Sequence, residues 1–122
     1  MRRVAALAAF AVLAFSSMRA SAADSGSPVD VAAVRAAEQA SWNANFKAAA
    51  PPRIDFVRVV GDYAVIGWVK GESGGMAAFH KTASGAWKKF IPDVGGALGA
   101  KDLEADGVPA SIAKQLVPGS PG

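Results

Sequence analysis

The sequence predicts an α+β fold, in which an N-terminal helix packs on a four-stranded antiparallel meander that is followed by short C-terminal helices. A change in hydrophobic spacing carries this prediction. Apolar residues recur at helical intervals up to Ala49, and they alternate with period two over Arg53–Ile91. Pro51-Pro52 separates the two patterns, and glycine-rich turns divide the second into short strands. We expect a single domain over residues 23–117, with a flexible tail at residues 118–122.

The first helix is expected over Pro28–Ala49. Ser27 can cap it, and Pro28 suits the first helical position because the N–H that proline lacks would stay unpaired there. Pro51-Pro52 ends it. Its apolar stripe consists of Val31, Val34, Trp42 and Phe46. Glu38 falls in the middle of that stripe, which leaves two interpretations open: a carboxylate that extends past alanines to the solvent, or a buried functional acid.

Ile54–Val60 and Tyr63–Lys70 are expected to form a hairpin, because glycine at the first position of the connection Gly61-Asp62 favours a tight two-residue turn. Pairing Val60 with Tyr63 then sets the register. One face of this hairpin collects the residues predicted to form the core: Val57, Val59, Ala64, Ile66 and Trp68. We expect the helix to cover this face, and only one face of the sheet to be covered.

The rest of the chain is expected to form two more strands, their turns and two short helices. The predicted turns and strands are Gly71–Gly75, Met76–Lys81, Thr82–Gly85 and Ala86–Ile91. The last strand should stop at Pro92, because proline cannot donate to a sheet. A glycine-containing loop then leads to the two helices, predicted over Lys101–Ala105 and Pro109–Val117.

The segment Met1–Ala22 has the order of a cleavable secretory signal. Arg2-Arg3 is positive, Val4–Phe15 is an uninterrupted apolar run of twelve residues, and Ala20-Ser21-Ala22 supplies the small residues of a cleavage site. Twelve residues are too few for a helix across a bilayer, which needs about 20. We therefore expect a periplasmic or secreted protein with no membrane span after cleavage, beginning with a loose leader at Ala23–Gly26.

Composition and charge argue against several classes of partner. Three of the thirteen basic residues lie in the signal segment, so the other ten balance the ten acidic residues and the high pI does not indicate nucleic-acid binding. The basic pair Lys88-Lys89 should point to opposite faces of the sheet. Because the chain has no cysteine, one histidine (His80) and one methionine after the signal (Met76), we expect no metal site and no cofactor.

The segment Gly71-Glu72-Ser73-Gly74-Gly75 matches the glycine–x–serine–x–glycine motif of serine hydrolases. That motif needs a strand followed by a helix, and its serine is followed in the chain by an acid and then a histidine. Here a strand pattern follows, and no acidic residue lies between Ser73 and His80, the only histidine. We therefore interpret the segment as a hairpin loop and predict that the protein is not an enzyme.

The same segment contributes to the predicted binding surface. Alternate connections of a meander lie at the same end of the sheet, so the loops Gly71–Gly75 and Pro92–Ala100 should converge. Glycine loops can offer backbone N–H and C=O groups to a periplasmic protein or a small polar ligand. The predicted binding residues are Glu72, Ser73, Gly74, Gly75, Asp93, Gly95 and Gly96. The alternative interpretation is that both loops are simple turns.

Several short segments carry a resemblance to a known family. They are Val60-Gly61-Asp62-Tyr63-Ala64, Gly67-Trp68, Gly71–Gly75, Gly85-Ala86-Trp87, Gly95-Gly96-Ala97, and Leu103 through Gly107-Val108-Pro109 to Leu116. On these segments the chain resembles a family of small uncharacterised secreted bacterial proteins, some of them described as copper uptake system-associated. Such relatives often have a cysteine near the position of Ile91-Pro92-Asp93, so no metal ligand is carried over. The resemblance implies a non-catalytic periplasmic accessory or binding protein, with a link to copper uptake.

Two other functions stay open. One is a small helix-plus-curved-sheet enzyme with Glu38 as its acid or base, which a pocket lined by Glu38 and Trp68 would favour. The other is a secreted inhibitory or structural protein that acts on another protein. A filled core with ordered loops on one rim would favour either this role or that of an accessory protein.

Overall fold

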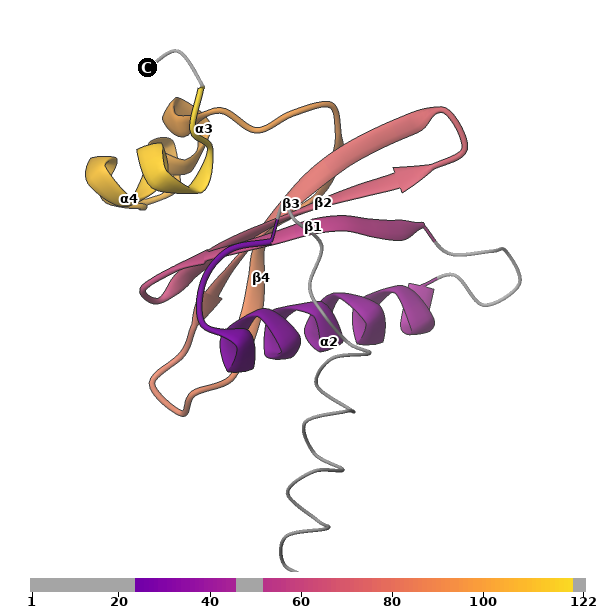
Figure 1. Cartoon of the computed structure of the whole chain (residues 1–122), viewed down its shortest axis with the longest axis horizontal. Helices are drawn as coiled ribbons and strands as arrows, with labels where there is room; N and C mark the ends of the chain where they lie inside the picture. Colours follow the sequence, from indigo (N-terminus) through magenta and orange to yellow (C-terminus); the bar gives the residue numbers. More distant parts are fainter. Residues whose placement is uncertain (1–23, 46–51, 120–122) are drawn as a thin grey trace, which may run out of the picture.

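A four-stranded antiparallel sheet lies between one long helix and two short ones (Figure 1). The computed structural model describes residues 24–45 and 52–119. In sequence order the elements are α2 (Pro28–Asn45), β1 (Arg53–Val60), β2 (Tyr63–Lys70), β3 (Ser73–Lys81), β4 (Trp87–Gly95), α3 (Ala100–Ala105) and α4 (Ala110–Leu116). The strands lie side by side in the order β1-β2-β3-β4, and each pair is antiparallel. The predicted α+β fold with a four-stranded meander is therefore confirmed.

The start of α2 agrees with the prediction. The side-chain oxygen of Ser27 accepts a hydrogen bond from the N–H of Asp30 at 3.4 Å, and Pro28 is the first helical residue. Several predictions concern parts of the chain outside the described residues: the helix end at Ala49, Phe46 of the apolar stripe, the signal segment Met1–Ala22, Ala23 and the end of the tail.

The residues just before α2 are bound to the edge strand β1, so the expectation of a loose leader is wrong for them. The N–H of Ser25 donates to the carbonyl of Val57 at 3.0 Å, and the N–H of Val59 donates to the carbonyl of Ser25 at 2.9 Å. The Asp24 carboxylate accepts from the N–H of Val57 and pairs with Arg35, both at 2.7 Å. These contacts cover part of the free edge of β1, which would otherwise offer unpaired backbone groups.

The register predicted for the first hairpin is confirmed, with Val60 opposite Tyr63. Gly61 has a φ of 59°, a left-handed conformation that glycine adopts without steric cost. The face toward α2 buries four of the residues predicted as core: Val57, Val59, Ala64 and Ile66. Trp68 is only partly buried, and it packs against the same cluster. The helix contributes Val31, Val34 and Trp42, and other buried members are Ile54, Ala77 and Phe79.

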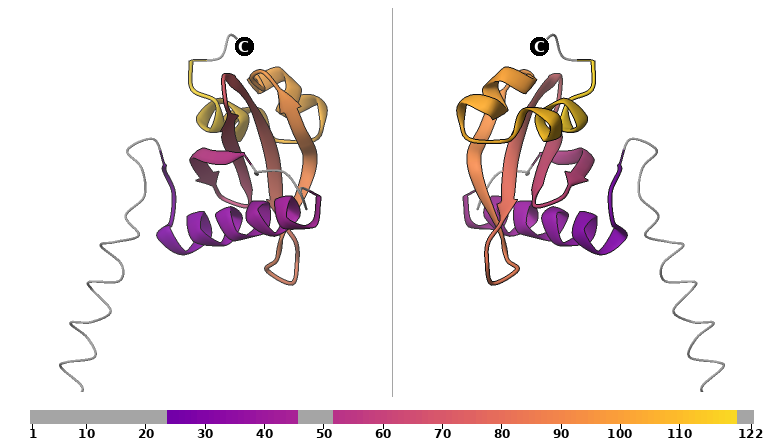
Figure 2. Two further views of the ribbon diagram at one scale, coloured as in Figure 1. Left: turned by 90° about the vertical axis from the view of Figure 1, so that its right-hand side faces the viewer. Right: turned by 90° about the vertical axis from the view of Figure 1, so that its left-hand side faces the viewer.

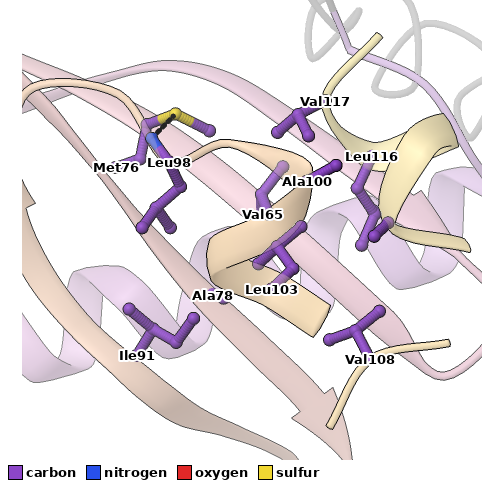
Figure 3. Close-up of a cluster of buried hydrophobic side chains, with 11 residues drawn as sticks. Val65, Met76, Ala78, Ile91, Leu98, Ala100, Leu103, Val108, Leu116 and Val117 are labelled. Carbon is purple, nitrogen blue, oxygen red and sulfur yellow. Dashed lines mark hydrogen bonds between the residues drawn. The ribbon is translucent and has the colours of Figure 1, made fainter. Parts of the chain in front are cut away.

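The opposite face of the sheet is also covered, so the expectation of one covered face is wrong. α3 and α4 fold back across that face, on the side away from α2 (Figures 1 and 2). Figure 3 shows the resulting second core, whose buried members are Val65, Met76, Ala78, Ile91, Leu98, Ala100, Leu103, Val108, Ala113, Leu116 and Val117. Arg58 of β1 donates to the carbonyl of Leu116 at 2.6 Å. The second face carries apolar residues such as Val65, and burying them stabilises the docked short helices.

Two strand boundaries differ from the predictions by more than one residue, whereas both short helices lie within one residue of their predicted ends. β3 begins at Ser73 instead of Met76, because Gly74-Gly75 continues the pairing with β2. β4 runs through Pro92 to Gly95 instead of ending before the proline. Proline is tolerated there because β4 is an edge strand, whose outer side makes no ladder hydrogen bonds. Register shifts between β3 and β4 bend this part of the sheet.

Candidate functional site

Four polar side chains meet beneath α2 in what we term the Lys89 cluster: Glu38, Ser41, Lys89 and Asp93. The Lys89 ammonium lies 2.6 Å from a carboxylate oxygen of Glu38 and 2.8 Å from one of Asp93. It also donates to the hydroxyl of Ser41 at 3.1 Å. Of the three N–H donors of the ammonium, two form these hydrogen bonds to Ser41 and Asp93, and Glu38 is held as a close ion pair.

Helix spacing and a bent strand bring these residues together. Glu38 and Ser41 are three positions apart on α2 and therefore share one face. Lys89 and Asp93 are four positions apart on β4, which on a regular strand would separate their Cα atoms by about 13 Å. The register shifts around Ala78 bend β4, and the long lysine side chain spans what distance remains. The Lys89 ammonium also lies over the Phe79 ring, 5.8 Å from its centroid.

Burial sets the electrostatics of the cluster. The Glu38 side chain has no exposed surface, and this desolvation, reinforced by nearby Asp93, raises the pKa of Glu38 to about 8 although Lys89 opposes the shift. Burial also acts to raise the pKa of Asp93, but hydrogen bonding to Glu38 and Lys89 outweighs it and the pKa is lowered. Near neutral pH the cluster therefore combines a protonated Glu38, an ammonium and one carboxylate, with no net charge.

The position of Glu38 decides between the two interpretations of its sequence. It is not a surface carboxylate that extends past alanines to the solvent, because it is fully buried beside Trp42 and Val34 in the core. Lys89 was not identified from the sequence. The alternation of side chains along β4 could have indicated it. Lys89 lies two positions after Trp87 and so shares the face toward α2, whereas Lys88 between them is exposed.

The two glycine segments of the predicted binding surface do lie together. Gly75 is opposite Gly95 in the sheet, and the N–H of Gly96 donates to the carbonyl of Gly74 at 3.0 Å. The exposed residues at this end of the sheet, which we term the glycine rim, are Gly71, Glu72, Ser73, Gly74, Gly95, Gly96 and Ala97. Most of them belong to paired strands or bond to one another, so the expectation of free loop backbone is wrong for Gly74 and Gly96.

Asp93 and Gly75 are placed differently from the other predicted binding residues. The Asp93 carboxylate binds Lys89 beneath α2 and belongs to the Lys89 cluster. Gly75 is covered by Trp68, whose ring would lie 2.3 Å from a Cβ atom at this position. Glu72, Ser73, Gly74, Gly95 and Gly96 are the exposed residues of the predicted set that lie on the glycine rim, whereas Asp93, which is also exposed, binds Lys89.

The serine of the hydrolase-like motif has no histidine beside it. Ser73 and His80 are seven positions apart on the same strand, β3, which corresponds to about 23 Å. The His80 ring packs edge-on against Phe90, with 5.6 Å between ring centroids. The motif connects two strands of a hairpin, as predicted, and lacks the strand-to-helix turn of a nucleophile elbow.

No protein-family model, curated protein or solved structure matches this chain. Within residues 24–45 and 52–119, no group of three or more histidine, cysteine, aspartate or glutamate side chains is arranged to hold a metal ion. None of the helices in that part of the chain is both long and apolar enough to cross a membrane.

Proposed function

We propose that the protein is a non-catalytic, exported binding or accessory protein and that the glycine rim is its contact surface. The observation that carries the proposal is the exposed end of the sheet, where Glu72 and Ser73 are the polar side chains among glycines. Sheet pairing between β3 and β4 supports the rim, so a partner would meet a surface with little conformational freedom to lose.

The Lys89 cluster supports the non-catalytic part of the proposal. A general acid or base must come within hydrogen-bonding distance of its substrate. Glu38 has no exposed surface, and Lys89 pairs with it while donating hydrogen bonds to Ser41 and Asp93. These groups therefore stabilise the contact between α2 and β4, and we do not assign acid–base chemistry to them.

The location and the link with copper uptake belong to the same proposal. Export is supported by the signal pattern of Met1–Ala22, and the intact mass of the exported protein tests it: a chain beginning at Ala23 is expected. The copper link is supported by the resemblance over Val60–Leu116, and we place it at a protein of the uptake machinery. Titration of the purified protein with Cu(I) and Cu(II) should show no stoichiometric binding. Tight binding would contradict the proposal and indicate that the protein transfers the metal itself.

The contact surface can be tested by affinity capture and cross-linking in periplasmic extract. The rim variant combines Glu72→Lys with Ser73→Arg, two exposed positions on the turn and the start of β3. The matched control is Glu104→Lys, an exposed reversal of charge on α3. Asp93 is left intact because it holds Lys89. We expect wild type and control to retain one specific partner and the rim variant to lose it. Retention by the folded rim variant, or no partner for wild type, contradicts the proposal.

A further inference from the structure

The two halves of α2 are attached to the rest of the domain by different polar contacts. In the N-terminal half, Asp30 pairs with Lys81 of β3 at 3.1 Å, and Arg35 pairs with Asp24. In the C-terminal half, Glu38 and Ser41 both bind Lys89 of β4. The polar part of the C-terminal attachment therefore depends on one ammonium, beside the buried Trp42, and its loss weakens this half while the N-terminal pairs remain.

The Lys89 cluster contains two carboxyl groups and a single cation. The polar or aromatic groups that face it are Glu38, Ser41 and Trp42 from α2, Lys89 and Asp93 from β4, and Phe79 from β3. Among the described residues, Lys89 is the only cation that pairs with either carboxylate. If both carboxyls ionise, one negative charge remains without compensation. Glu38 has no exposed surface and shares this single cation with Asp93, so ionising Glu38 is unfavourable and a proton is retained there while α2 is docked.

We propose that the Lys89 cluster is a proton-dependent latch, which fastens the C-terminal half of α2 to β4 while it holds one proton and releases that half in mildly alkaline solution. The proton resides mainly on Glu38, the more buried carboxyl, while Asp93 stays ionised beside Lys89. When the proton is lost, Glu38 gains hydration only if the helix segment moves away from the sheet. The pairs Asp30–Lys81 and Arg35–Asp24 each match one acid with one base, so the opening stops near the middle of the helix.

Hydrogen exchange of the purified mature protein, followed by mass spectrometry, tests the latch. Protection factors are compared at pH 6 and pH 9 for peptides that cover residues 28–35 and 38–45. At pH 9, about one unit above the transition, we expect the protection of residues 38–45 to fall by about tenfold. Residues 28–35 should keep their protection. Constant protection of residues 38–45, or simultaneous opening of both halves and the sheet, would overturn the latch.

Two substitutions remove the need for a proton in different ways. Glu38→Gln leaves Lys89 with Asp93, and Asp93→Asn leaves Lys89 with Glu38, so each cluster is neutral without a titrating group. Both variants should show the same protection at pH 6 and pH 9. Asp30→Asn is the matched control on the same helix: it weakens the N-terminal half but should keep the alkaline loss in residues 38–45. A wild-type response in both cluster variants would contradict the proposal, and two variants guard against one that fails to fold.

Discussion

The indole ring of Trp68 lies directly against Gly75 on the neighbouring strand. A Cβ atom at Gly75 would be 2.3 Å from this ring and 1.9 Å from the carbonyl oxygen of Val94, far inside van der Waals contact. Gly67 has the same relationship with Phe56 on the other side of the sheet, at 2.2 Å. At both positions, an aromatic ring thus occupies the space that a side chain on the strand glycine would fill.

Replacing Gly75 by alanine should therefore destabilise the domain. The new methyl group would meet backbone as well as a ring, so we expect a loss of about 1–3 kcal/mol in the free energy of unfolding. Gly95, its partner across the strands, is the matched control because a Cβ atom there meets nothing within 4 Å. Gly95→Ala should be neutral or slightly stabilising. Urea titration of both variants measures the difference, and equal stability would show that the close contact relaxes freely.

Trp68→Ala should remove the ring that covers Gly75 and leave a gap at the edge of the core under α2. Because Trp68 is only partly buried, we expect a loss of about 3 kcal/mol, at the low end for truncation of a large aromatic residue. Chemical denaturation followed by circular dichroism gives the value. A loss below about 1 kcal/mol would mean that the ring contributes little to this core.

Lys89 and its neighbour Lys88 should respond very differently to substitution by methionine. Lys89→Met leaves the buried Glu38 and the Asp93 carboxylate without their cation, and leaving a buried polar group unpaired in this way costs about 1–3 kcal/mol. Lys88 is exposed on the same strand, so Lys88→Met should change the stability by less than about 0.5 kcal/mol. Thermal and urea unfolding at pH 7 compare the two. Similar losses for both variants would argue against a structural role of the Lys89 cluster.

Stability should fall as the pH rises from about 4.5 to about 8. The pKa of Glu38 is raised in the folded protein from its ordinary 4.5, so over this interval the folded state binds more protons than the unfolded state. The contribution of Glu38 to the free energy of unfolding is complete below its pKa in the unfolded state. It is lost once the pH reaches its pKa in the folded state, a change on the order of 4 kcal/mol. Asp93, whose pKa is lowered, acts oppositely and costs stability only in more acidic solution.

Urea unfolding at half-unit pH intervals measures this slope. Glu38→Gln should be nearly insensitive to pH over the same interval, because the amide does not titrate. The exposed acid Glu104 on α3 provides the control, and Glu104→Gln should keep the wild-type slope. A flat wild-type profile would show that Glu38 ionises normally in the folded domain.

Local patterns predicted most of the fold. The hairpin register follows from Gly61-Asp62, which permits one tight turn, and from alternation that buries Val57 and Ile66 together. These signals depend on neighbouring residues, so they can be read without knowledge of the tertiary structure. The extension of β4 past Pro92 could not be predicted in this way, because the effect of proline depends on whether the strand lies at an edge of the sheet.

The candidate sites also contain parts that local patterns predict and parts that depend on distant segments of the chain. The meeting of the two glycine segments follows from the topology of a meander, but their strand pairing, including the bond from Gly96 to Gly74, was not predicted. Glu38 stood out as an acid within an apolar stripe, yet its burial depends on Lys89, some fifty positions later in the chain. Pattern analysis of either segment alone gives no indication of the other.

The sequence by itself determined the order of the elements, the first hairpin register and the α2-facing core, because turn chemistry and hydrophobic period act over a few residues. Only the tertiary structure decided that both sheet faces are covered and that the buried Glu38 shares one cluster with Lys89 and Asp93. Those outcomes depend on how segments far apart in the chain pack against each other, and on whether a buried charge meets an opposite charge there.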